Sequence, residues 1–241
     1  ESYFGTDSVD PRKKEEYLQK VHVWMDCLQK RQWKSRTKRC LKESTEFSIK
    51  KEKAISCYHR RDFSPDVLEK VVEEHIRLRR EKPSALTKDS PNVTVSILEE
   101  GGKKISVKEY CPATIWDRFR EHFRRSKGLK AWIAGNGLRV RGIPSLKPVG
   151  LMETRSWLGL KESFFIMEDK EPGLELDRYI LRGLGDHRER RIFVKAFAQW
   201  LSQSYQMGIY HQDMKTCNIL VSKEGKAWVF HLLDLEDVRL D

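Results

Sequence analysis

The sequence has no long apolar run, and this absence removes several classes of protein from consideration. No stretch approaches the roughly 18 apolar residues that a membrane-spanning helix requires. Residues 1–5 lack the basic start and apolar core of a signal peptide. A hydrophobic fraction of 39% beside a charged fraction of 34% instead favours a soluble, globular chain.

Cysteine is scarce and unsuitably spaced for cross-links or metal binding. The five cysteines are odd in number, and no two of them form a C-x-x-C pair. We therefore expect neither a disulfide framework nor a zinc site, and we expect a reducing, cytoplasmic environment.

Acidic residues are outnumbered by basic ones. The chain has 47 Lys and Arg against 36 Asp and Glu, which gives a formal net charge of +11. This charge favours an anionic partner, which could be nucleic acid, acidic lipid headgroups or a phosphorylated glycan. Charge alone does not choose among the three.

Residues 11–30 form a predicted amphipathic helix, with apolar residues at helical spacing. We expect this stripe to pack on the body of the same protein. The alternative is a helix that lies on a membrane surface, which the basic segment 31–39 around Trp33 supports. A nucleic-acid-binding role rests only on charge and Trp33, and we do not expect it. The stripe consists of Tyr17, Leu18, Val21, Trp24, Met25 and Leu28.

The middle of the chain is rich in predicted strands. Alternating apolar residues and the Gly101-Gly102 turn predict the clearest hairpin. Ser64-Pro65 begins a predicted helix that ends before Pro83. Its apolar face includes His75, which we expect to be a core residue rather than a ligand. The predicted strands are 45–50, 54–60, 93–98, 105–110, 149–153 and 163–168, and two helical segments are predicted at 113–125 and 128–136.

The C-terminal part is mainly helical until a short hairpin. A short helix is predicted at 174–181, and the most strongly periodic helix is 188–207, which ends at Gly208. Two strands, 218–221 and 227–233, follow. This order predicts an α+β fold with two lobes like those of protein kinases. We divide it into an N-terminal helical and basic extension (1–40), a β-rich N-lobe (41–170) and a helical C-lobe (171–241).

The segment His211-Gln-Asp-Met-Lys-Thr-Cys-Asn218 is the most informative motif, because its spacing resembles the kinase H-R-D-x-K-x-x-N loop. In this interpretation Asp213 orients the acceptor hydroxyl and accepts its proton, while Lys215 offsets phosphoryl charge. Asn218 and the later Asp234 hold Mg²⁺ against the phosphates of ATP. The alternative is that these residues are ordinary turn formers and strand caps.

Three further residues belong to the predicted nucleotide site. Lys108 follows Val107 on a predicted strand, like the lysine that grips the α and β phosphates in kinases. A lysine facing solvent is the alternative. Backbone groups near Glu168 and Lys170 are placed, by order along the chain, against the adenine. We expect His211 to hold the loop by local hydrogen bonds.

Residues 37–240 resemble the lipopolysaccharide core kinase family, which phosphorylates Kdo or heptose sugars. The resemblance implies ATP and Mg²⁺ as cofactors, a lipid-linked acidic glycan as acceptor, and work at the cytoplasmic face of the inner membrane. The stretch from Trp132 to Pro144 narrows the match to this family. The resemblance rests on Ser106–Tyr110, Arg125–Trp132, Leu138–Pro144, Ser163–Glu168, Gly208–Val221 and Leu232–Asp237.

The sequence departs from the kinase pattern at three places. No glycine occurs between Gly5 and Gly101, so a glycine-rich phosphate loop is absent, and we place the 49–54 turn in that role. Lys130 stands near the position where relatives carry the glutamate partner of the lysine, and Glu121 is the substitute. Gln212 replaces the usual arginine, so control by a phosphorylated activation loop is not expected. An atypical protein kinase and a nucleotide-binding pseudokinase or adaptor remain the alternatives.

Overall fold

The computed structural model describes residues 11–112, 114, 124–157, 159–169, 173–225 and 227–241. The helical segment predicted at 113–125 therefore lies almost wholly outside the described residues, as do Glu121 and Lys170.

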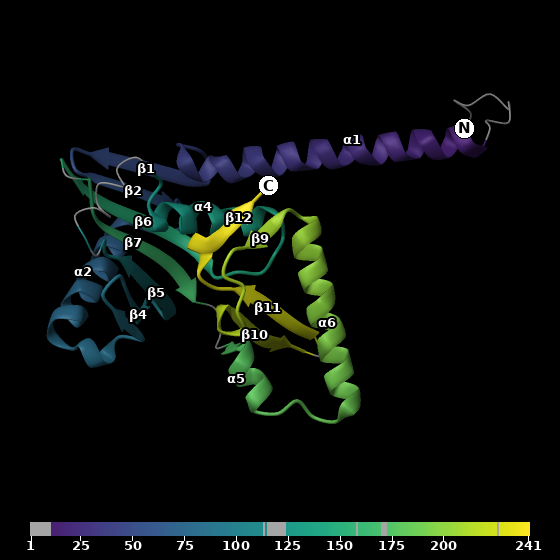
Figure 1. The fold of residues 1–241 in the computed structure, drawn as a ribbon. Coiled ribbons are helices and arrows are strands. Elements are labelled where there is room, and N and C mark those ends of the chain that lie inside the picture. The colour runs from purple at the N-terminus through teal and green to yellow at the C-terminus, as the bar shows by residue number, and fades with distance from the viewer. Residues whose placement is uncertain (1–10, 113, 115–123, 158, 170–172, 226) are drawn as a thin grey trace.

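An antiparallel sheet of seven strands forms the larger part of the molecule, with the strand order β1-β2-β6-β7-β5-β4-β3 (Figure 1). Each predicted strand in this region is confirmed, and the short β3 is additional. Lys108 and Glu168, two of the predicted site residues, lie on the neighbouring strands β5 and β7 near the middle of the sheet. The strands are β1 (Phe47–Glu52), β2 (Ile55–Arg60), β3 (Lys88–Ser90), β4 (Val93–Glu100), β5 (Lys103–Tyr110), β6 (Lys147–Ser156) and β7 (Gly159–Asp169).

The two faces of this sheet pack against different elements, because successive side chains on a strand point to opposite sides. On β7, Phe164 and Ile166 pack with the apolar face of α2 (Pro65–Glu81). Phe165 and Met167 belong to the other core, with α4 (Lys127–Val140) and the C-terminal elements. A short 3-10 turn, η2 (Pro83–Ala85), follows α2.

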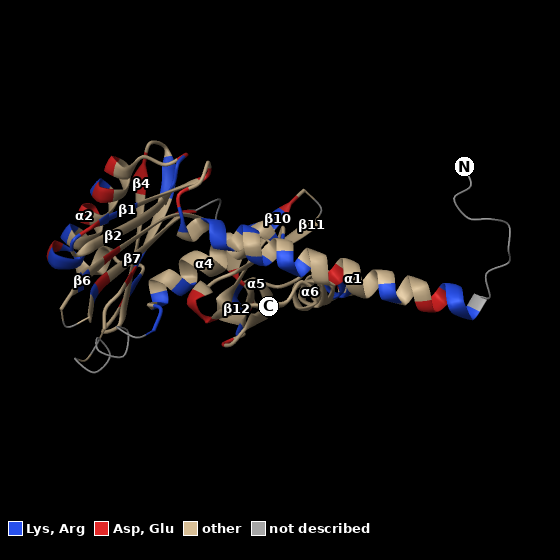
Figure 2. Ribbon diagram, turned by 90° about the horizontal axis from the view of Figure 1, so that it is seen from above, with Lys and Arg blue, Asp and Glu red and all other residues tan. Residues whose placement is uncertain are grey.

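The N-terminal helix α1 (Pro11–Thr37) is longer than predicted and extends away from the rest of the chain (Figures 1 and 2). The expectation that its apolar stripe packs on the body is wrong, since Tyr17 is 65% exposed and Trp24 64%. Against the described residues, only the C-terminal end of the helix is anchored. There Trp33 packs against the guanidinium group of Arg141 at 5.2 Å, and η1 (Lys38–Leu41) leads into the sheet.

The C-terminal elements build a small second part around the predicted hairpin. Gly208 ends the longest helix here with φ of +68°, as the C-terminal stop of a helix requires. The apolar side of that helix packs with β11 through Phe193 and Trp200. These elements are β8 (Leu174–Glu175), α5 (Leu176–Leu181), α6 (His187–Gln206), β9 (Ile209–His211), η3 (Thr216–Asn218), β10 (Ile219–Glu224), β11 (Ala227–Leu232), η4 (Leu235–Asp237) and β12 (Val238–Leu240).

The α+β class, the sheet-rich part, the helical part with its catalytic-type hairpin and the N-terminal helix are thus all present. Among the described residues, no helix is both long enough and apolar enough to span a bilayer.

Candidate active site

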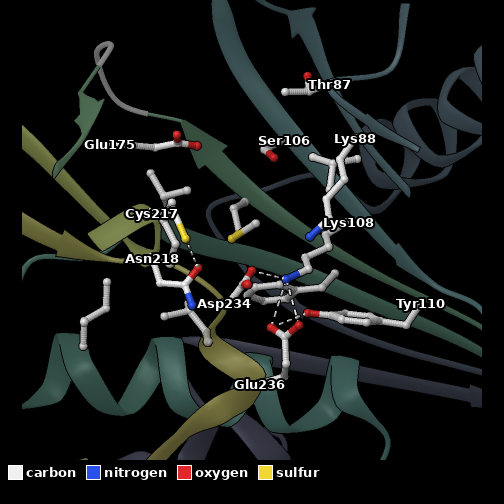
Figure 3. A pocket seen from close by; sticks show the side chains of 17 residues that line it. Thr87, Lys88, Ser106, Lys108, Tyr110, Glu175, Cys217, Asn218, Asp234 and Glu236 are labelled. Carbon is white, nitrogen blue, oxygen red and sulfur yellow. Dashed lines mark hydrogen bonds and ion pairs between the residues drawn. The ribbon is translucent and has the colours of Figure 1, made fainter. Parts of the chain in front are cut away.

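A pocket of about 350 Å³ lies where the sheet meets the C-terminal hairpin (Figure 3). Lys108 and Tyr110 reach it from β5, and Lys88 reaches it from β3. Asn218 precedes β10 and Asp234 follows β11, so both lie at the open end of the β10–β11 hairpin. The pocket therefore brings together three of the residues that the sequence predicted to bind nucleotide and metal.

Lys108 lies at the centre of this arrangement and is only 7% exposed. Its Nζ atom lies 2.6 Å from Asp234 Oδ1, and 2.8 Å and 3.0 Å from the two carboxylate oxygens of Glu236. Burial alone would lower the pKa of Lys108, but the negative charges of Glu236 and Asp234 outweigh burial and raise it. The alternative of a lysine facing solvent is excluded, and Lys108 stays a cation at neutral pH.

Asp234 follows β11 with φ of +46° and ψ of +54°, in the left-handed region. A residue other than glycine in this region carries backbone strain, which proteins retain mainly where it positions a functional group. Burial raises the pKa of Asp234, but the charge and hydrogen bond of Lys108 exceed this effect, and the pKa is lowered. An ionised carboxylate is therefore presented to the pocket.

The loop from His211 to Asn218 is held by hydrogen bonds within it and to Leu233, the residue after β11. His211 accepts from the Asp213 amide at 3.2 Å, and its other ring nitrogen lies 2.9 Å from the Leu233 carbonyl oxygen. The Asn218 amide nitrogen donates to the Asp213 carbonyl at 2.9 Å. The predicted local role of His211 agrees with this geometry.

The side chains of Asp213 and Lys215 form an ion pair at 2.8 Å, outside the lining of the pocket. Lys215 is exposed and Asp213 is half-buried, and the hydrogen bond and charge of Asp213 raise the pKa of Lys215. They are accessible to an acceptor that approaches from solvent.

The donor atoms near Asn218 and Asp234 suit a hard cation. Because the Asn218 nitrogen bonds to the Asp213 carbonyl, the oxygen of the amide is left for the pocket, where Cys217 Sγ is its neighbour at 3.8 Å. In the described part of the chain, no three His, Cys, Asp or Glu residues gather into a metal cluster. One amide, one carboxylate and phosphate oxygens are nevertheless a usual Mg²⁺ set, because this ion keeps few protein ligands.

The predicted adenine contacts are only partly described. Met167 and Phe165 of β7 line the pocket, but the Glu168 side chain does not. It forms ion pairs with Lys103 at 3.2 Å and Lys147 at 3.3 Å. Lys170 and Glu121 lie outside the described residues, so their predicted contacts are not seen.

The 49–54 turn is not a phosphate loop, and this prediction is wrong. It joins β1 and β2 at one edge of the sheet, whereas Lys88 and Val95, which line the pocket, belong to the β3–β4 hairpin at the other edge. Sequence reasoning missed this hairpin because β3 has only three residues. It also missed Lys88 and Glu236, although the position of Glu236 beside Asp234 was a usable signal.

A lysine from a central strand, an Asp–Asn loop and a strained aspartate after the hairpin that follows this loop define a protein-kinase-like architecture. The profile of the lipopolysaccharide kinase (Kdo/WaaP) family matches residues 70–240, and the chain belongs to this family. The predicted family and fold class are both confirmed.

Solved structures with a similar chain path include WaaP in complex with acyl carrier protein, at 18% identity and a TM-score of 0.48. The match covers 65% of this chain and 62% of that chain, which is less than two thirds of its length. A double mutant of the PknI kinase domain of Mycobacterium tuberculosis has 18% identity and a TM-score of 0.40, over 63% of this chain and 56% of that one. No curated protein matches the sequence.

Proposed function

We propose that this chain is an ATP- and Mg²⁺-dependent kinase that phosphorylates a sugar hydroxyl, on Kdo or heptose, of the lipopolysaccharide inner core. The observation that carries the proposal is the meeting of Lys108, Asn218 and Asp234 in one pocket. Kinase-type phosphoryl transfer depends on such positioned charges rather than on covalent chemistry with the protein. Membership of the Kdo/WaaP family supports a sugar acceptor.

Each residue has a distinct role in this proposal. Lys108 binds the α and β phosphates, and Asn218 and Asp234 supply the oxygens for Mg²⁺, which offsets phosphate charge. Asp213 orients the sugar hydroxyl. It accepts the hydroxyl proton while the hydroxyl oxygen forms a bond to the γ-phosphorus. The bond to the departing ADP breaks in the same step, and Lys215 offsets charge on the transferred group.

The test is transfer of labelled phosphate from ATP to purified core glycolipid. Asp213→Ala and Asp213→Asn should each reduce kcat by at least about a hundredfold, the scale of lost acid–base catalysis. Asp66→Asn, which changes an exposed aspartate on α2, is the matched control and should behave as the wild type.

The outcomes separate this function from its alternatives. Activity that survives Asp213→Ala overturns the assigned role. Phosphate found on protein rather than on glycan favours an atypical protein kinase. Calorimetric binding of ATP that needs no Mg²⁺ and gives no turnover favours a nucleotide-binding pseudokinase.

We also propose that the chain works at an anionic membrane surface, the cytoplasmic face of the inner membrane, with α1 as the contact. Residues 12–32 are all exposed, and their stripe includes Trp24 and Leu28. A helix with aromatic and aliphatic residues on one side and lysine and arginine elsewhere suits an acidic lipid interface. A second copy of α1 is a poorer partner, because like charges would repel. The basic residues of α1 are Arg12, Lys13, Lys14, Lys20, Lys30, Arg31, Lys34 and Arg36, against Glu15, Glu16 and Asp26.

Vesicle co-sedimentation tests this contact. We expect binding to phosphatidylglycerol vesicles, little binding to phosphatidylcholine vesicles, and loss of binding in a Trp24→Ser, Leu28→Ser variant. Trp157→Ser is the matched control, because Trp157 is 88% exposed in the β6–β7 turn, away from α1. Equal binding by the α1 variant overturns the contact, and dimers in sedimentation velocity that the α1 variant abolishes point instead to a second copy.

A further inference from the structure

We propose that Glu236 is the positioning residue for Lys108, so that the lysine's carboxylate partner comes from the turn after Asp234. In protein kinases a glutamate on a helix beside the sheet provides this partner. This role rests on the proposed phosphotransfer function, in which Lys108 binds phosphate and Glu236 holds that lysine in place.

The contacts of Glu236 use both of its carboxylate oxygens. Oε1 lies 2.8 Å and Oε2 lies 3.0 Å from Lys108 Nζ, and the Tyr110 hydroxyl donates to Oε2 at 2.9 Å (Figure 3). The Glu236 side chain is only 10% exposed. A buried carboxylate with this many charged and polar partners is fixed in one orientation, and it fixes the ammonium group in turn.

Between β5 and β6, the one helix that the structure describes contributes no carboxylate. Helix α4, residues 127–140, lies between β5 and β6 in the chain and contains no Asp or Glu. Within the described part of the chain, the ion pairs of Lys108 are those to Asp234 and Glu236. The work of the helix glutamate is therefore taken by η4.

Asp234 cannot replace Glu236 in this role during turnover. Once Asp234 faces a metal ion, its charge is directed to that ion, and phosphate oxygens approach the lysine from the same side. An ammonium group has three donors, so Lys108 can exchange its bond to Asp234 for a phosphate while it keeps Glu236. Without Glu236, the buried cation would lose its carboxylate partner once Asp234 turns to a metal ion.

The turn that carries Glu236 is firmly held. Leu235 is buried, and a Cβ added at Gly135 of α4 would lie 3.1 Å from its Cδ1 atom, so the turn approaches the helix closely. The Asp237 amide donates to the Asp234 carbonyl at 3.0 Å, and the Gln212 amide donates to the Asp237 carbonyl at 2.9 Å. This short turn thus couples Lys108, the metal-binding Asp234 and the catalytic loop.

A double-mutant cycle tests the inference. Glu236→Gln is compared with Lys108→Ala and with the double variant, by KM for ATP, kcat and the affinity for a non-hydrolysable ATP analogue with Mg²⁺. We expect Glu236→Gln to weaken analogue affinity and raise KM about tenfold in the wild-type background, and less than about twofold in the Lys108→Ala background. Glu224→Gln, at an exposed position of β10, is the control and should match the wild type.

The results separate the two proposals. Equal losses in both backgrounds, with a lowered melting temperature, would mean that Glu236 is merely structural and would overturn its positioning role. An active wild type with an unaffected Glu236→Gln variant would overturn it as well, and would leave the kinase function intact. A wild type that neither binds the analogue nor transfers phosphate would overturn both.

Discussion

Lys108 and Glu109 are neighbours on β5 and point to opposite faces of the seven-stranded sheet. Lys108 enters the pocket, whereas Glu109 is fully buried on the other side, where it meets α2. There it bonds to His75 at 3.2 Å, to the Thr94 hydroxyl at 2.9 Å and to the Arg79 guanidinium group. The strand that carries Lys108 is thus anchored by a buried charge one residue away.

Glu109→Gln should therefore destabilise the fold in a pH-dependent way. Burial would raise the pKa of Glu109, but the bonds from His75, Cys111 and Thr94 and the charge of Arg79 lower it to about 2. A lowered pKa means that the ionised group stabilises the fold above its ordinary pKa, and that this contribution disappears as the pH falls toward 2. The shift corresponds to ~3 kcal/mol at pH 7.

Urea unfolding at pH 7, 5 and 3 measures this effect. The stability difference between wild type and Glu109→Gln should be largest at pH 7 and shrink at pH 3. Glu99→Gln, at an exposed position of β4, is the control and should show no such trend. A difference that is constant across the three pH values would contradict the assigned role.

The sequence predicted most of this arrangement where its local signals were strong. Alternating residues located β4 and β5, and the motif spacing selected Asn218 and Asp234, which both line the pocket. The sequence could not show whether the apolar stripe of α1 is buried, because the same stripe is expected of a helix that packs on its own chain and of one that stays exposed. Nor could it identify the hairpin over the pocket, because strand order across a sheet depends on long-range pairing, and a three-residue strand has almost no periodic signal.

Lys88→Ala should weaken nucleotide binding. Lys88 lines the pocket from the edge strand β3, and its positive charge contributes to the lowered pKa of Asp234. An exposed cation near phosphate should change affinity about three- to tenfold at low salt, and less at high salt because of screening. Titration with a fluorescent ATP analogue at two salt concentrations measures this. Lys161→Ala on β7 is the control, and a salt-independent loss would contradict an electrostatic role.

Gly135→Ala should lower activity through η4. The new Cβ would lie 2.5 Å from Pro148 Cγ and 3.1 Å from Leu235 Cδ1, so Pro148 must move and the Leu235 side chain, which belongs to the turn that carries Glu236, must yield slightly. Overpacking costs about 1–3 kcal/mol, which the better helix propensity of alanine offsets by about 1 kcal/mol. Kinetics and thermal unfolding should show a clear loss of kcat with a small change in stability. Lys130→Ala on the exposed side of α4 is the control. If Gly135→Ala lowers the melting temperature but the folded protein keeps its kcat, the coupling of α4 to activity through η4 is contradicted.

The two positive-φ residues other than glycine in the described chain, Asp234 and Lys53, allow strain and function to be separated. Asp234 has φ of +46° in the pocket, and Lys53 has φ of +40° in the exposed β1–β2 turn. Glycine relieves the left-handed strain at either position, an effect of about 1 kcal/mol. Lys53→Gly should therefore raise stability slightly and leave activity and nucleotide affinity unchanged, since the 49–54 turn is remote from the pocket.

Asp234→Gly should behave differently, because the same relief of strain is accompanied by the loss of a charged group. The variant loses the 2.6 Å ion pair with Lys108, but Lys108 keeps Glu236, so stability should stay within about 1 kcal/mol of the wild type. Phosphotransfer should fall by at least about a thousandfold, because the metal loses its carboxylate. Parallel melting curves and transfer assays on both variants measure the contrast. An Asp234→Gly variant that retains activity would show that the strained aspartate is not the metal ligand. Loss of activity in Lys53→Gly would show that the β1–β2 turn contributes to the active site after all.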